Sequence, residues 1–236
     1  MKNKILLITA LFSASVLFAG GKDSETKTTT HIVSVSGNTE ISILGKYTYL
    51  EIETWDKDEV SIEATVIFNG KMTDRVRKFL DEFCQNVKDG ITKSGNELTI
   101  KTRLEEPNRV QIGSRHIGIQ IGYSEKELSI EYVIKVPGSN RLNINGAYED
   151  IVMNGTYDDV EISQYSADLN AGTFKKAKLN LKYGDANIEY IGAGEMETYE
   201  QDLEIDEIEF LDINTKYSEL TFDKVQEMTV IGYETD

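Results

Sequence analysis

The sequence predicts a mainly β protein: a parallel β-solenoid in the C-terminal half, after a β-rich N-terminal part with one short amphipathic α-helix. Three observations support this. Tyrosines recur at nearly constant intervals from residue 148 onward, short alternating strands accompany each of them, and a helical period appears between residues 73 and 89. Internal repeats of this size are typical of solenoids, because one unit cannot bury its apolar side alone.

The repeated tyrosines set the expected coil length. Successive gaps are 17, 18, 16, 18 and 16 in the row Tyr148, Tyr165, Tyr183, Tyr199, Tyr217 and Tyr233. One short strand precedes each tyrosine turn and another follows it, so stacked coils of about 17 residues over 139–236 are predicted. A coil of about 34 residues fits the same spacing. An antiparallel sandwich or barrel is a further alternative.

Residues 1–19 have the pattern of a signal peptide. Lys2 and Lys4 precede an apolar run that ends at Phe18, and small residues follow at Ala19 and Gly20. No cysteine follows the run, so no lipoprotein anchor is expected there. The run is also too short to span a bilayer comfortably, so no stable transmembrane segment is expected after cleavage. We expect export to the periplasm, the outer membrane or the extracellular space, with 20–30 as a flexible tether.

The N-terminal part is predicted to span 31–138 and to alternate between strands and one helix. Apolar residues at helical spacing predict a helix over 73–89, with Thr73 or Asp74 as its cap and Gly90 closing it in a left-handed conformation. The glycine-containing stretch 105–122 predicts an exposed hairpin or a mobile loop, whose role the sequence leaves open.

Composition and motifs argue against catalysis. Asp and Glu outnumber Lys and Arg by 41 to 25, which argues against binding to a nucleic-acid backbone. No catalytic, cofactor or metal-ligand motif appears, so no such site is predicted and the protein is expected not to be an enzyme. Cys84 is interpreted as a buried inert thiol, and His116 as a solvated loop residue.

Two roles fit the tyrosines themselves. They can form an offset-stacked ladder that stabilises the coils, or an aromatic platform for glycans or peptides. A last coil begins at Tyr233 (YETD). We expect that open end to be covered by the acidic tail, by the N-terminal part or by another molecule, which includes a homo-oligomer.

Several segments together resemble a family of exported, adhesin-like β-strand-repeat proteins of the Bacteroidetes type. These are IETWDKDEVSIEA (52–64), the short helix, SIEYVIKVP (129–137), and the repeats KYGDANIE and KYSELTF. The resemblance covers nearly the whole chain after the signal peptide. It implies an exported β-helical protein, and it brings no catalytic residues with it.

The function expected from the sequence is therefore a non-catalytic envelope or cell-surface protein with an adhesin-like or structural role. Its partner would be a protein or a glycan at the cell surface. One alternative is a glycan-binding or polysaccharide-acting β-helix protein, because large β-helices host such sites. Another alternative is a periplasmic component linked to envelope-stress signalling.

Overall fold

Strands make up most of the structure. The computed structural model describes residues 24–102, 111–112, 115–116 and 128–235. The predicted signal peptide and most of 105–122 lie outside these residues. The prediction of a mainly β protein with one short helix is confirmed. The elements are β1 (Ser24–Ser34), β2 (Glu40–Leu44), β3 (Tyr49–Trp55), β4 (Glu59–Asn69), α1 (Asp74–Asp89), β5 (Ile91–Ser94), β6 (Glu97–Lys101), β7 (Gln111–Ile112), β8 (Arg115–His116), β9 (Leu128–Pro137), β10 (Arg141–Ala147), β11 (Asp150–Tyr157), β12 (Asp159–Tyr165), β13 (Leu169–Lys216) and β14 (Glu219–Tyr233).

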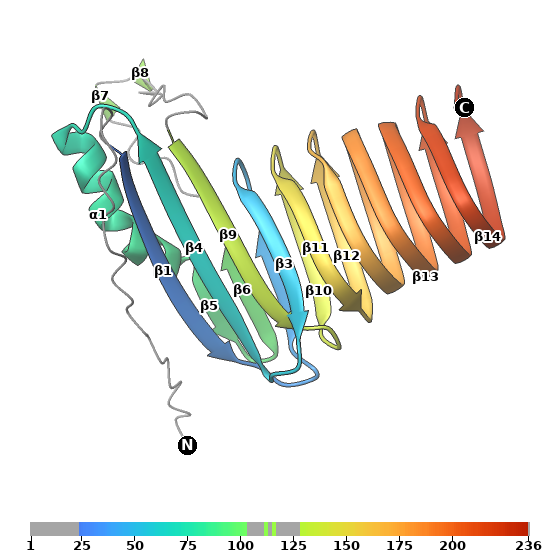
Figure 1. Cartoon of the computed structure of the whole chain (residues 1–236), viewed down its shortest axis with the longest axis horizontal. Coiled ribbons are helices and arrows are strands. Elements are labelled where there is room, and N and C mark those ends of the chain that lie inside the picture. The colour runs from blue at the N-terminus through green and yellow to red at the C-terminus, as the bar shows by residue number, and fades with distance from the viewer. Residues whose placement is uncertain (1–23, 103–110, 113–114, 117–127, 236) are drawn as a thin grey trace.

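Most strands join one sheet that is not closed on itself. Its order is β1-β4-β9-β3-β11-β13-β12-β10-β2-β6-β5, and β14 is added beside β13. The first part of the long β13 pairs with β11 and the next part pairs with β12, so β13 connects these two strands within the sheet. The parallel strands β9, β3 and β11 are called ladder A, and the parallel strands β6, β2, β10 and β12 are called ladder B. The strands follow one another along the long axis of the molecule (Figure 1).

Pairing in the C-terminal half is parallel, with a nearly constant register. Leu142 lies beside Val160, and Val160 in turn lies beside Ala177. At the other end of the molecule Leu203 lies beside Leu220. The sequence separation within each of these pairs falls inside the range of the intervals between tyrosines. Parallel neighbours therefore recur at the spacing of the tyrosines.

The same ladders continue into the N-terminal part of the sequence. Leu142 also lies beside Ile41 of β2, and Ile151 lies beside Leu50 of β3. Residues 40–55 thus occupy the position next to 141–154, although a long stretch of chain separates the two segments. That stretch supplies β4, α1, β5, β6 and β9. The division of the chain at 138 stays a prediction.

Alternating side chains of both ladders form one core. Leu50, Ile52, Ile151 and Met153 of ladder A are 1% exposed or less. In ladder B the matching buried residues are Ile41, Ile43, Leu142, Ile144, Val160 and Ile162. Each strand turns every second side chain inward, so stacked strands form continuous apolar columns. This continuity matters because burying one such side chain stabilises the fold by about 1.5–3 kcal/mol.

Helix α1 covers the core at the end formed by β1, β4 and β5. Val76, Leu80, Phe83 and Val87 are buried on its inner face, as the helical spacing predicts. The Thr73 side chain accepts a hydrogen bond from the Val76 amide and caps the helix. The prediction for Gly90 is wrong, since its φ of -72° is right-handed. A glycine fits there because a Cβ would lie 2.8 Å from the Lys101 carbonyl oxygen.

The predicted tether is also corrected, since residues 24–30 belong to strand β1. This strand pairs antiparallel with β4 from Ser24 to Ser34. Its run of threonines favours an extended chain, and the Thr28 hydroxyl lies 3.0 Å from the Thr65 hydroxyl across the ladder. A polar composition alone therefore did not identify a flexible segment here.

Candidate interaction surfaces

The six predicted tyrosines lie side by side in sequence order along one flank of the stacked strands. Neighbouring ring centroids are 5.7, 5.1, 5.3, 5.6 and 5.5 Å apart. The planes of each pair cross at angles between 66° and 89°. The expected offset stacking is therefore wrong for these pairs, which meet edge to face. Both arrangements suit the electron distribution of aromatic rings.

The edge-to-face geometry follows an alternation in the backbone. Tyr148, Tyr183 and Tyr217 adopt a positive φ of 55°, 61° and 55°. In the other copies the positive φ falls on the residue after the tyrosine, as at Ser166 and Glu200. Those copies carry one extra residue before the next strand, and the shifted left-handed position accommodates it. Neighbouring tyrosines thus leave the backbone in different orientations, and their rings cross.

A seventh tyrosine, which the spacing did not predict, belongs to the same row. Tyr47 has a φ of 59°, and its ring lies 5.2 Å from the Tyr148 ring at an angle of only 11°. Tyr47 and Tyr148 both have the positive φ on the tyrosine itself, and their rings stack face to face. The signal was the Lys-Tyr pair of Lys46 and Tyr47, repeated as Lys182-Tyr183 and Lys216-Tyr217.

The tyrosine row, Tyr47 together with the six predicted tyrosines, forms a partly exposed aromatic strip. Exposed fractions run from 37% at Tyr183 to 66% at Tyr47, and Tyr199 is half-buried. The Lys46 ammonium lies 4.7 Å from the Tyr47 ring centre and 5.7 Å from that of Tyr148. Desolvation beside its neighbours raises the pKa of the Tyr199 phenol, and the Glu200 carboxylate adds to the shift. The strip offers phenol hydroxyls and ring edges to solvent.

Glu149, the residue that follows Tyr148 of the tyrosine row, is a buried acid. It is 1% exposed, and neither carboxyl oxygen makes a hydrogen bond of normal geometry. Burial raises the pKa of the Glu149 carboxyl to about 7, and the nearby Thr48 and Thr102 hydroxyls oppose only part of that rise. No sequence pattern distinguished this acid from its exposed neighbour Asp150.

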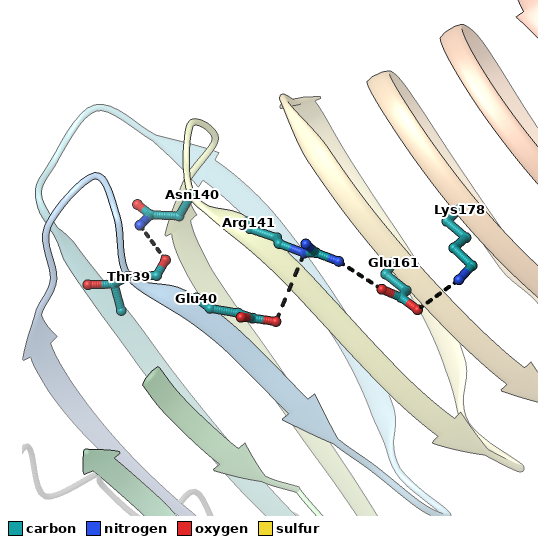
Figure 2. Close-up of polar contacts among 6 residues, drawn as sticks. All are labelled: Thr39, Glu40, Asn140, Arg141, Glu161 and Lys178. Carbon is teal, nitrogen blue, oxygen red and sulfur yellow. Dashed lines mark hydrogen bonds and ion pairs between the residues drawn. The ribbon is translucent and has the colours of Figure 1, made fainter. Parts of the chain in front are cut away.

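The outer face of ladder B carries a row of alternating charges. The Arg141 guanidinium lies 3.9 Å from the Glu40 carboxylate and 2.9 Å from that of Glu161. The Lys178 ammonium lies 3.7 Å from Glu161 on its other side. Figure 2 shows these four side chains in sequence across neighbouring strands. Such exposed pairs contribute little stability individually, about 0–1 kcal/mol each.

Two adjoining hollows follow this face toward the C-terminal end. Both are lined by Glu161, Lys178, Glu195, Asp212 and Thr229. Beyond Lys178 the acids Glu195 and Asp212 form no ion pair within the described part of the chain. Acids outnumber bases in the lining of both hollows, which disfavours anionic ligands.

Neither surface shows the side-chain set of a metal centre. Within the ranges that the structure describes, no three or more His, Cys, Asp or Glu side chains lie close enough to hold a metal ion. Cys84 is partly buried against the core with a free thiol, and the side chain of His116 lies outside the described residues. No described helix is long and apolar enough to cross a membrane.

No family model matches this chain. No curated protein matches it either. Among solved structures, it is similar to a "putative adhesin" from Parabacteroides distasonis, at 14% identity and a TM-score of 0.42, over 89% of this chain and 95% of that one. A "putative cell adhesion protein" from Clostridium sporogenes matches at 12% identity and a TM-score of 0.30, over 92% and 100%.

A third similar structure is a "putative lipid binding protein" from Parabacteroides distasonis. It matches at 12% identity and a TM-score of 0.27, over 91% of this chain and 95% of that one. Because the TM-scores and the sequence identities of all three are low, no function is taken from these similarities.

Proposed function

We propose that this chain is a non-catalytic, exported protein of the cell envelope or cell surface that binds a partner through the flank of a parallel β-solenoid. The parallel register, which repeats at the spacing of the tyrosines, supports the solenoid. The apolar run and small residues of 1–21 support export. On this proposal the coils are a rigid support, and the exposed tyrosine row is the binding surface.

The regular spacing of exposed rings is the observation that supports this role. Neighbouring centroids lie between 5.1 and 5.7 Å apart, and most rings expose more than a third of their surface. Rings held by neighbours lose little side-chain freedom on binding, which lowers the entropic cost of association. A row of this kind fits an extended ligand that presents the same group repeatedly.

A glycan is the second candidate for the extended ligand that the tyrosine row would bind. Phenol rings offer flat apolar faces with a hydroxyl at the tip, which suits sugar rings that are apolar on one face and polar at the edge. The acidic hollows on ladder B disfavour a polyanionic glycan, so a neutral chain is the better fit. A protein partner would instead lay an extended segment along the row.

Binding to isolated cell envelopes and to an array of neutral and acidic glycans tests the proposal. We expect the Tyr165→Ala, Tyr183→Ala double variant to lose at least about tenfold in affinity, since each lost hot-spot ring costs about 1 kcal/mol or more. Tyr190→Ala is the matched control, because this tyrosine lies outside the row. Equal binding by both variants, with unchanged circular dichroism, would refute a binding role for the tyrosine row.

A further inference from the structure

The two ends of the stack of strands differ in which elements cover them. At the N-terminal end, the antiparallel strands β1 and β4 extend ladder A, β5 extends ladder B, and α1 packs beside them. At the opposite end lies β14, which pairs with β13 along one side. Its other edge has no strand partner among the described residues. Figure 1 shows α1 and β14 at opposite ends of the long axis.

The apolar residues of β14 are uncovered where their counterparts one repeat earlier are buried. Ile208 is 1% exposed, whereas Val225 beside it in the ladder is 44% exposed. Ile213 is 2% exposed, whereas Val230 beside it is 43% exposed. Leu220, Phe222 and Met228 are only partly buried. Such an edge is a template for another strand. β14 has no proline, and its edge protection is limited to charged residues such as Asp223, Lys224 and Glu227.

We propose that β14 pairs with β14 of a second copy of this chain, antiparallel and about a two-fold axis that passes at Val225. In this register Phe222 lies opposite Met228 of the second copy, and Leu220 lies opposite Val230 of the second copy. Val225 lies opposite itself. Every inward-facing apolar side chain of the strand thus meets another, and Thr221 meets Thr229 on the outer face. The apolar columns of the two copies become one.

A second copy fits this edge because the edge is complementary to itself. A pairing in which the same patch serves both partners is closed, so it gives a dimer and not a fibre. At the N-terminal end the outer strands β1 and β5 lie beside α1, so the edge presented there differs from that of β14. A ladder over the 15 residues of β14 would supply about as many hydrogen bonds as a typical interface, roughly 10 ± 5.

Charge opposes the same contact and makes it sensitive to salt. In the proposed register Asp223 faces Glu227 of the second copy, and this pair occurs twice. The whole chain has a net charge of -16, so two copies also repel one another at long range. Salt screens this repulsion, and at 0.1 M the screening length is about 10 Å. Association is therefore expected to strengthen as the salt concentration rises.

Cross-linking at the axis tests the register directly. In a Cys84→Ser background, Val225→Cys of the chain without residues 1–19 places two thiols opposite each other. Directly opposite residues in an antiparallel pair have Cβ atoms about 4.5–5.5 Å apart, close to disulfide reach. Ile231→Cys is the matched control, since it is also exposed on β14 but lies opposite Glu219 of the second copy.

We expect rapid disulfide formation for Val225→Cys and little for Ile231→Cys. Light scattering should give an average mass that rises toward that of a dimer as the protein or salt concentration increases. Val225→Lys should weaken dimerisation by about 100-fold. A monomer at all concentrations would overturn the proposal. So would larger assemblies, or a dimer in which Val225→Cys and Ile231→Cys cross-link equally. None of these outcomes depends on whether the tyrosine row binds a partner.

Discussion

The carboxyl group of Glu149 fills the space that a side chain at Gly45 would need. A Cβ built on Gly45 would lie 2.0 Å from Oε2 and 2.2 Å from Oε1 of Glu149. These two residues belong to segments far apart in the sequence, joined where the Gly45 amide donates to the Asn145 carbonyl at 2.9 Å. The glycine and the buried acid therefore depend on each other.

Gly45→Ala should destabilise the protein through this contact. Because Glu149 is enclosed by the core, its carboxyl cannot turn to solvent, and overpacking of this kind typically costs about 1–3 kcal/mol. Urea unfolding would measure the loss. Gly37→Ala is the control, since a Cβ there meets nothing within 4 Å, and it should change stability by less than about 0.5 kcal/mol. Equal effects of both substitutions would contradict the packing account.

The stability of the protein should fall between about pH 4.5 and pH 7 because of Glu149. Burial raises the pKa of this carboxyl from 4.5 to about 7, so in this window the folded chain holds a proton that the unfolded chain has lost. The free energy of unfolding then decreases as pH rises. A shift of this size corresponds to about 3 kcal/mol, at about 1.4 kcal/mol for each pKa unit.

The Glu149→Gln variant isolates that contribution. Its amide stays neutral, so the difference in unfolding free energy between pH 5 and pH 8 should shrink by about 2–3 kcal/mol relative to the unmodified protein. Glu204→Gln removes an exposed acid and serves as the control, with the pH dependence retained. If Glu149→Gln keeps the full pH dependence, the buried carboxyl is not its cause.

Tyr199→Ala should cost about twice as much stability as Tyr233→Ala. The Tyr199 ring packs against two aromatic rings, those of Tyr183 at 5.3 Å and Tyr217 at 5.6 Å, whereas the Tyr233 ring packs against one, that of Tyr217, among the described residues. Each aromatic pair is worth about 0.5–1.5 kcal/mol beyond burial. Both positions have the positive φ on the following residue, so the backbone is matched. Thermal unfolding would compare them, and equal losses would argue against pairwise ring contacts.

Asn140→Asp should destabilise the junction between β2 and β10. The buried Asn140 amide donates to the carbonyl oxygens of Ser36 and Thr39, each at 2.7 Å, and the contact with Thr39 is drawn in Figure 2. Aspartate has the same shape but no donor, so both carbonyls lose their partner at an expected cost of about 2–4 kcal/mol. Asn145→Asp on β10 changes an exposed amide; it is the control and should stay within about 0.5 kcal/mol.

The sequence predicted the regular parts of this protein well because they repeat. Constant spacing from Tyr148 onward indicated the strands, and the period of Val76, Leu80 and Phe83 indicated the helix. Tyr47 was missed because a long insertion separates it from the next tyrosine of the row, which removes the spacing signal although the Lys-Tyr motif persists. Residues 24–30 were missed because their partner strand β4 determines their structure, and no local pattern reveals it.

Glu149 illustrates what sequence patterns do not show in a stacked fold. Glu149 and Asp150 are adjacent acids, and the first is buried while the second is exposed. Burial depends on Gly45, Thr48 and Thr102, which come from a distant part of the chain and leave room for the carboxyl. The strand pairing that brings them together is a tertiary property.

The alternation of left-handed positions along the tyrosine row has a consequence for how such a protein can lengthen. From Tyr148 to Tyr233, turns with the positive φ on the tyrosine alternate with turns that have it on the following residue. The smallest segment that can be duplicated without disturbing its neighbours therefore contains one turn of each kind. Gain or loss of a single turn would place two turns of the same kind together. That situation exists once among the described residues, at Tyr47 and Tyr148, where the rings lie flat on each other. The segment that carries the helix lies between these two tyrosines in the sequence, after β3 and before β10.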